Sequence, residues 1–190
     1  MKHYLLFIIA ILFIMFSCCK DSSTNPTNNI TVVMDTHFDN QGQPSLSGWQ
    51  DGYPIYGRRK SSYSFSNDIP LNGGIWSLKV FTPDSFESIM RYAVRLPQPT
   101  QSKRYRLIFA SKSLLNSYCS IQFQAFYGTS EEGAFYGVSS PFWKQDSVYY
   151  NSNDKTTDSL VVYINVYSPS NNKIDTTKYV LFNEFKIEEY

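Results

Sequence analysis

From Ile30 to the C-terminus the sequence is a succession of short segments in which apolar and polar residues alternate. Side chains of a β-strand point alternately to opposite faces, so this period of two predicts strands with one buried face. Turn residues such as Asn72-Gly73-Gly74 separate the segments, and no stretch shows a convincing helical period. Strands at this spacing predict an all-β fold, an antiparallel β-sandwich of the jelly-roll kind.

One stretch, residues 83–96, fits both a helix and a strand. Its apolar residues stand at helical spacing, but Met90, Tyr92 and Val94 also alternate cleanly until Pro97 and Pro99, which we expect to end the segment. We therefore predict a strand over 88–96. The full set of expected strands is 31–36, 53–56, 62–66, 75–81, 88–96, 104–112, 118–127, 147–151, 160–167 and 179–187, with residues 128–133 as a solvated turn.

The chain begins with an apolar segment, Tyr4–Phe16, that follows Lys2 and precedes a small residue and two cysteines. It is shorter than the ~20 residues that a membrane-spanning helix needs, and its flanks are typical of a secretory signal. A cysteine directly after such a segment is similar to a bacterial lipobox, in which the thiol is lipidated. Two registers fit, so both Cys18 and Cys19 are candidate lipidation sites. An ordinary cleaved signal with incidental cysteines is the alternative.

These features divide the chain into a lipoprotein signal peptide at residues 1–19, a flexible tether at 20–29 and a β-sandwich domain at 30–190. The tether is small, polar and without periodicity, so it cannot bury apolar surface. Lys20-Asp21 resembles the export signal of surface lipoproteins in Bacteroidetes-like bacteria. We expect a lipid-anchored protein of the bacterial outer membrane, on its periplasmic side or exposed at the cell surface.

Charge and cysteine usage exclude several classes of function. Lys and Arg total 17 against 16 Asp and Glu, so no basic field favours nucleic acid as a partner. Cys119 is the one cysteine outside the leader, which leaves the domain to be held by its core rather than by disulfides. Because Cys119 alternates with apolar residues, we interpret it as a small buried residue. A catalytic thiol would have to rely on His37, the only histidine after the leader.

Four stretches carry a more specific pattern: His37-Phe38-Asp39 with Gly48-Trp49; Ile89–Pro97 with Tyr105–Lys112; Trp143 with Val148-Tyr149-Tyr150 and Asp158-Ser159-Leu160; and Val180–Ile187. Together they resemble the jelly-roll carbohydrate-binding modules of the galactose-binding-like superfamily, especially the xylan- and glucan-binding families. The likeness runs from Thr36 to the end of the chain. It implies that Trp49 and Trp143 pack in the core, and Trp76 has neighbours that also favour the core.

The resemblance also implies a structural calcium ion, held in those families by an early acid and a closing aspartate together with backbone carbonyls. Asp39 matches the early acid, whereas the closing position falls on Asn183 with Glu184 beside it. Calcium prefers oxygen ligands, and an asparagine offers one carbonyl oxygen at lower charge. The alternative is that Asp39 stabilises a turn through its side chain.

Sugar binding needs flat aromatic faces together with amide or charged groups that form hydrogen bonds with the hydroxyls of the sugar. Gln122 and Gln124 lie on one face of their predicted strand, together with Phe126, and that face is either a ligand surface or a solvated outer surface. Aromatic residues in or beside loops at strand ends are further candidates. The candidate ligand-binding residues are therefore Tyr56, Tyr63, Gln122, Gln124, Tyr127 and Tyr136.

The sequence contains no G-x-S-x-G, H-E-x-x-H or P-loop motif, and it predicts no enzyme. Its aromatic content, 17% of all residues, exceeds ordinary usage and leaves rings available for ligand contact. We expect a non-catalytic surface protein whose sandwich binds a polysaccharide or other glycan. The alternative is a structural or adhesion lipoprotein that binds a protein partner through a flat apolar patch.

Overall fold

The structure, a computed structural model, describes residues 30–52, 60–82, 87–100, 102–114, 119–153, 155–167 and 178–190. The predicted signal peptide, the tether, Cys18, Cys19 and the candidate ligand residue Tyr56 lie outside these ranges. None of the described residues belongs to a helix that is long and apolar enough to cross a membrane.

Every regular element of the described ranges is a β-strand. The strands are β1 (Thr31–Thr36), β2 (Asp39–Asn40), β3 (Gln43–Pro44), β4 (Gln50–Asp51), β5 (Ser62–Ser66), β6 (Ser77–Phe81), β7 (Ser88–Thr100), β8 (Arg104–Ser113), β9 (Cys119–Tyr127), β10 (Ser130–Gly137), β11 (Lys144–Asn151), β12 (Thr157–Val166) and β13 (Val180–Glu189). The predicted strands at 31–36 and 62–66 are confirmed residue for residue, and the strand predicted at 53–56 lies outside the described ranges.

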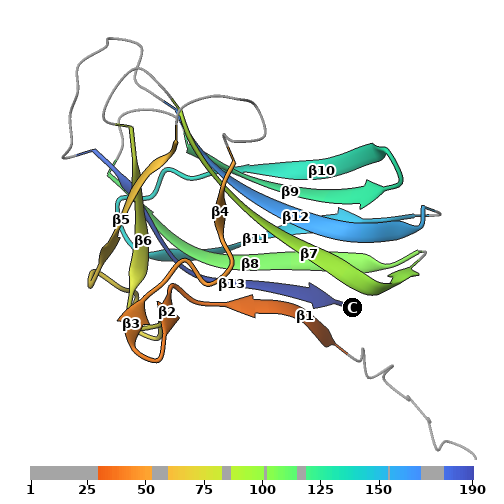
Figure 1. Cartoon of the computed structure of the whole chain (residues 1–190), viewed down its shortest axis with the longest axis horizontal. Helices are drawn as coiled ribbons and strands as arrows, with labels where there is room; N and C mark the ends of the chain where they lie inside the picture. The colour runs from red at the N-terminus through yellow and green to blue at the C-terminus, as the bar shows by residue number, and fades with distance from the viewer. Residues whose placement is uncertain are drawn as a thin grey trace, which may run out of the picture.

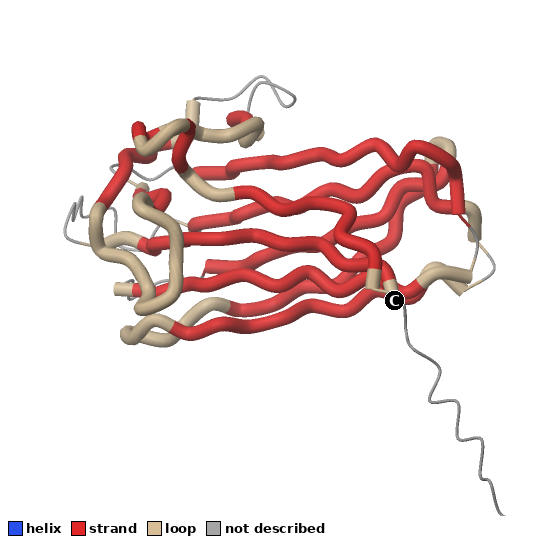
Figure 2. Tube along the Cα trace, turned by 90° about the horizontal axis from the view of Figure 1, so that it is seen from below, coloured by secondary structure: helices blue, strands red, loops and turns tan. Residues whose placement is uncertain are grey.

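The strands form two large sheets that pack face to face (Figures 1 and 2). Sheet I has the order β11-β8-β13-β6-β5, with β1 also paired to β13, and sheet II has the order β10-β9-β12-β7-β4. The short strands β2 and β3 form a separate hairpin. All pairs within these sheets are antiparallel, which confirms the predicted antiparallel β-sandwich.

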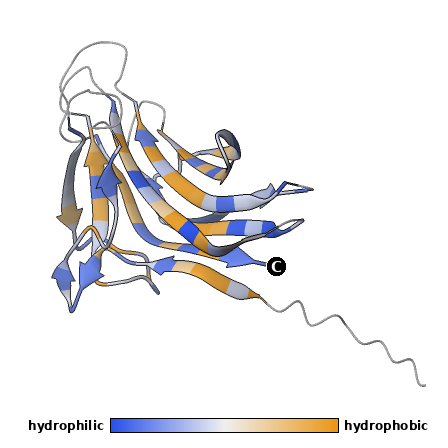
Figure 3. Cartoon of the chain, turned by 45° about the vertical axis from the view of Figure 1, so that its right-hand side comes forward, coloured by the Kyte–Doolittle hydropathy of each residue, from blue (hydrophilic) through white to orange (hydrophobic). Residues whose placement is uncertain are grey.

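The core lies between the inward faces of the two sheets, and the alternation of apolar and polar residues along the strands is visible in Figure 3. Phe185 of β13 is fully buried at its centre, with ring contacts to Phe38, Trp49, Phe109 and Phe182. Trp49 is 3% exposed, which confirms its predicted core position. Cys119 is buried as predicted, and this burial raises the pKa of its thiol far above the ordinary range.

β7 and β10 differ most from the sequence-based expectation, while β11 and β12 each begin three residues earlier than predicted and β2, β3 and β4 were not predicted. β7 does not end before Pro97 but continues to Thr100. The proline is tolerated because β4 pairs with β7 only at Met90 and Arg91, so the later part of β7 has no described partner on that side. The stretch predicted to be a solvated turn at 128–133 instead leads into β10, whose Gly-rich and Glu-rich sequence carries little strand signal.

Candidate functional site

A row of side chains crosses all strands of sheet II on its outward face. Phe135 lies opposite Gln122, Gln122 opposite Tyr163, Tyr163 opposite Arg91, and Arg91 opposite Gln50. We call these five residues the cross-strand row. Neighbouring strands lie about 4.8 Å apart, so the row extends for about 19 Å across the sheet.

The period of two explains why these side chains face outward. The inward positions on either side of them, among them Ile121, Phe123, Val162 and Ile164, are fully buried in the core. Residues between those positions must therefore point away from the core. Phe135 is 66% exposed, whereas Gln122, Tyr163 and Arg91 are half-buried.

Neighbouring rows on the same face add polar side chains that are sheltered from solvent. Ser120 lies opposite Asn165 in the next row, and they are only 1% and 6% exposed. In the row on the other side Gln124 is 9% exposed, so it is not on a simply solvated surface. The structure thus confirms that Gln122 and Gln124 share one face of a strand and places them beside groups from three other strands.

Three of these side chains hold sheltered polar atoms for which the described chain offers no partner: Arg91 Nε, Ser120 Oγ and Asn165 Nδ2. A buried polar atom without a hydrogen bond costs free energy, on the order of 1–3 kcal/mol each. Native structures leave few such atoms unpaired, and a water, an ion or a ligand that completes the bonding is one explanation for those that remain. Their concentration on one face marks it as the best candidate for a binding site.

The chemistry of the cross-strand row suits a flat polar ligand. Two rings, Phe135 and Tyr163, alternate with two amides, Gln122 and Gln50, and with the guanidinium of Arg91. Rings supply apolar contact area, and amides and guanidinium groups supply directional hydrogen bonds. The row itself contains no carboxylate or thiol, and it offers no nucleophile or acid–base pair.

The other aromatic residues predicted from the sequence do not join this row. Tyr63 lies on β5 of sheet I and is 40% exposed. Tyr127 ends β9, where Lys155 Nζ donates to its hydroxyl at 2.9 Å. Tyr136 sits on β10 but points toward the core and packs its ring edge-on against Phe109. The structure therefore brings together the two glutamines and separates them from these tyrosines.

Two of the three residues predicted to hold calcium, Asn183 and Glu184, have side-chain partners, whereas Asp39 is shown with a contact of its backbone carbonyl, which accepts from Ser47 Oγ at 3.0 Å. Asn183 is 1% exposed, and its amide accepts a hydrogen bond from Gly74 N–H and donates one to the Trp76 carbonyl, each at 2.9 Å. Glu184 Oε1 accepts from Gln145 on sheet I. No group of three or more His, Cys, Asp or Glu side chains gathers within the described ranges. Calcium also takes backbone carbonyl and water oxygens, so binding of the ion at Asp39, Asn183 and Glu184 stays a prediction.

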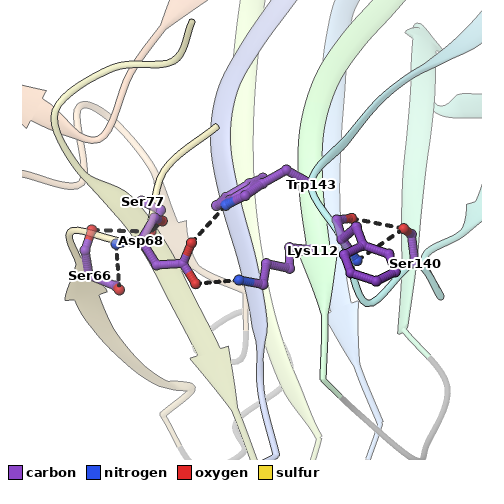
Figure 4. A network of polar contacts seen from close by, with 7 residues as sticks. Ser66, Asp68, Ser77, Lys112, Ser140 and Trp143 are labelled. Carbon is purple, nitrogen blue, oxygen red and sulfur yellow. Dashed lines mark hydrogen bonds and ion pairs between the residues drawn. The ribbon is translucent and has the colours of Figure 1, made fainter. Parts of the chain in front are cut away.

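Trp143 is half-buried on the outward face of sheet I, so the prediction that it packs in the core was wrong. Its indole N–H donates to Asp68 Oδ1 at 2.8 Å, and Lys112 Nζ contacts Asp68 Oδ2 at 2.6 Å (Figure 4). Burial raises the pKa of Asp68, but the hydrogen bonds from Lys112 and Trp143 outweigh it and hold that pKa below its ordinary value. Trp76 is also only partly buried, and it packs against the core edge.

Grooves occur elsewhere on the molecule. One of about 430 Å³ lies between β1 and β7 and is lined mainly by aliphatic residues, with Arg95 and with Glu189, whose carboxylate pairs with Lys103. Another, of about 290 Å³, borders Trp143 and Leu71 on sheet I. Neither gathers unpartnered polar atoms in the way that the outward face of sheet II does, and we therefore place the candidate site on that face.

Sequence reasoning missed Gln50, which lies outside every predicted strand, and four residues inside predicted strands: Arg91, Ser120, Tyr163 and Asn165. The alternation within the predicted strands already put each of these four opposite an apolar face. What the alternation could not supply is the pairing order, which decides that residues from β7, β9, β10 and β12 meet in one surface.

No family model matches the chain, and no curated protein matches its sequence. Solved structures do match it. The CBM22-1 xylan-binding domain of Paenibacillus barcinonensis Xyn10C aligns with a TM-score of 0.52 and 13% identity, over 84% of this chain and 94% of that one. The CBM22-1 and GH10 modules of Clostridium thermocellum Xyn10B, complexed with xylohexaose, align with a TM-score of 0.53 and 12% identity, over 84% and 28% of the two chains.

An enzymatically active domain of the tailspike protein 4 of bacteriophage CBA120 is also similar, with a TM-score of 0.52 and 10% identity over 86% of this chain and 20% of that one. At such identities the likeness concerns the fold alone, and a fold does not fix a function. The chain has the all-β sandwich fold of carbohydrate-binding modules.

Proposed function

We propose that this chain is a non-catalytic glycan-binding protein whose ligand lies across the outward face of sheet II. The observation that carries the proposal is the cross-strand row, in which rings alternate with hydrogen-bonding groups beside three sheltered polar atoms without described partners. A pyranose has apolar C–H faces and a rim of hydroxyls, so it can stack on Phe135 or Tyr163 while Gln122 and Arg91 hydrogen-bond its rim.

Binding without catalysis is favoured by the charges of the row. A glycosidase of the usual kind needs two carboxyl groups about 5 to 9.5 Å apart across the sugar. The cross-strand row supplies two amides and a guanidinium instead. The shared fold with a xylan-binding domain supports the same choice, and xylan or a related polysaccharide is the first ligand to try.

The test uses the chain without its first 29 residues, which retains the complete sandwich, and measures its binding to plant and bacterial polysaccharides by titration calorimetry. Tyr163→Ala and Gln122→Ala are each expected to weaken binding about tenfold, because a buried aromatic or amide contact is worth about 1.4 kcal/mol or more. Tyr149→Ala and Gln145→Ala on sheet I are the matched controls and should leave binding unchanged.

If the chain binds no polysaccharide of the panel, glycan binding is refuted, and the alternative function, a sandwich that binds a protein partner, is favoured. If the sheet I control variants lose as much affinity as the variants of the cross-strand row, the ligand does not bind at that row. Both outcomes are read against thermal melting curves, so that an unfolded variant is not mistaken for one that cannot bind.

We further propose that the chain is exported and anchored to the bacterial outer membrane through lipid on Cys18 or Cys19. The apolar segment followed by two cysteines supports this proposal, as does the polar stretch at residues 20–29. Acyl chains stabilise an anchor by about 0.8 kcal/mol for each buried CH₂, and stable attachment takes more than one chain. Many copies on one surface would compensate for weak binding at each site.

Labelled palmitate tests the anchor. The native chain is expected to incorporate the label, and a Cys18→Ala, Cys19→Ala double variant to lose it. The two single variants identify the register, because only the lipidated cysteine is essential. Continued labelling of the double variant would overturn the proposal, and membrane fractionation of the same cells tests the predicted compartment.

A further inference from the structure

Two arginines stand at the β7 end of the proposed ligand surface. Arg91 belongs to the cross-strand row, and Arg95 lies opposite Ser159 on the same outward face, since residues four apart in a strand share a face. At about 3.3 Å per residue the two positions are about 13 Å apart along the strand. Arg95 is exposed, whereas Arg91 is half-buried.

Half of the described lysines and arginines, six of twelve, already have acidic partners. The pairs are Lys103–Glu189, Arg106–Glu188, Lys112–Asp68, Lys144–Asp146, Lys155–Glu132 and Lys186–Glu188. Neither Arg91 nor Arg95 has an acidic side chain within ion-pair distance among the described residues, and Arg91 Nε is sheltered without a partner. A sheltered N–H without an acceptor is costly unless a ligand or water supplies one.

The nearest acid along the Arg95 row is at the opposite edge of the sheet. Glu131 on β10 lies opposite Phe126, which lies opposite Ser159, which lies opposite Arg95. Three strand spacings separate Glu131 from Arg95, about 14 Å, so the two charges do not neutralise each other. Glu189 lines the groove between β1 and β7 together with Arg95, but its carboxylate is paired with Lys103, so among the described residues the positive charges at β7 have no acidic partner of their own.

We propose that the glycan bound on this face carries carboxylate groups, as a uronic-acid polysaccharide does, and that Arg91 binds a carboxylate with Arg95 as a second contact. The inference rests on the proposed function, since it names the class of sugar for the same surface. A guanidinium forms two parallel hydrogen bonds to a planar carboxylate, and such charge-assisted pairs are stronger than neutral ones. A neutral sugar would leave the positive charge at β7 uncompensated.

The experiment compares polymers that share a backbone and differ in charge. Binding of the chain without its first 29 residues is measured for polygalacturonate and its methyl ester, and for glucuronoxylan and its carboxyl-reduced form. The acidic member of at least one pair is expected to bind about tenfold more tightly than its neutral partner, and this difference should shrink with added salt.

Variants then assign the effect to the arginines. Arg91→Gln should abolish the preference for the acidic polymer, Arg91→Lys should retain part of it, and Arg95→Gln should reduce it. Arg104→Gln is the matched control, because Arg104 is an exposed arginine on β8 of the other sheet. Equal losses in Arg104→Gln would show general electrostatic attraction and overturn the assignment.

Failure of this inference is distinguishable from failure of the proposed function. Equal binding of acidic and neutral polymers, with Tyr163→Ala still weakening both, would overturn the acidic ligand and leave glycan binding intact. If dextran sulfate binds more tightly than every uronic-acid polymer, the proposal that the arginines bind a carboxylate is overturned. If no polymer binds, both proposals fall together.

Discussion

Trp143 and Asp68 are 75 positions apart in the chain, yet the indole N–H donates a hydrogen bond of 2.8 Å to the Asp68 carboxylate. The contact joins the connection before β11 to the loop between β5 and β6, on the outward face of sheet I. Lys112 of β8 binds the other carboxylate oxygen (Figure 4). One side chain thereby ties the β5–β6 loop to β8 and to the connection before β11, two segments that a backbone hydrogen bond from Ser113 N–H to the Ser140 carbonyl already links.

The lowered pKa of Asp68 predicts how this contact responds to acid. A carboxyl whose pKa is lower in the folded than in the unfolded state adds stability above its ordinary pKa, and loses it as the pH falls through the folded value. We expect Asp68→Asn to melt about 2 °C lower than the native chain at pH 7, because a partly exposed pair contributes ~1 kcal/mol or less. The gap should narrow as the pH falls below 3.8, the ordinary pKa of an aspartate, and close once the carboxyl is protonated in the folded state as well. A gap that persists unchanged to pH 2 would contradict the ionic origin.

Asn183 is expected to be essential to the turn at Gly74 and Trp76. Asn183→Ala removes a buried acceptor and a buried donor at once, and should lower the free energy of unfolding by about 2 kcal/mol in denaturant titrations. Glu184→Gln, one residue away and oriented toward Gln145, is the control and should change it by less than about 0.5 kcal/mol.

Calcium is tested on the same turn. Because the amide of Asn183 already serves two backbone groups, we expect EDTA to leave the melting temperature of the native chain unchanged. A fall in melting temperature with EDTA that calcium restores would show that the predicted ion is bound after all.

Gly133 is expected to tolerate no side chain. A Cβ there would stand 2.4 Å from the Phe123 carbonyl oxygen and 2.9 Å from Gln124, in the β10–β9 pair beside the cross-strand row. Gly133→Ala should therefore lower both the stability and the glycan affinity, measured by melting curves and calorimetry. Gly128→Asn is the control: its positive φ is one that asparagine adopts, and nothing lies within 4 Å of its Cβ position.

Phe185 is expected to carry more of the stability than any exposed ring. Phe185→Ala opens a cavity among four other aromatic rings and should cost about 3–5 kcal/mol in unfolding free energy. Phe142→Ala is the matched control, since that ring is 77% exposed and its removal should cost less than about 0.5 kcal/mol. Equal losses would contradict the position of the core.

Much of the fold could be predicted from the alternation of apolar and polar residues, because a strand with one buried face has an apolar residue at every second position. β1 and β5 were predicted with their observed bounds. β10 was missed because it is an edge strand rich in glycine and glutamate, with few inward residues. The bounds of β7 were wrong because a proline can continue a strand where the adjacent edge needs no hydrogen bond.

The sequence alone predicted only part of the candidate site. The sequence alone determined that Gln122 and Gln124 share a face, that Cys119 is buried, and that the chain is built from strands, since each follows from local periodicity. Only the tertiary structure decided that Tyr163 and Arg91 stand beside Gln122 and that Tyr136 does not. Strand order and register join segments distant in the chain, and the alternation within one strand carries no information about its neighbours.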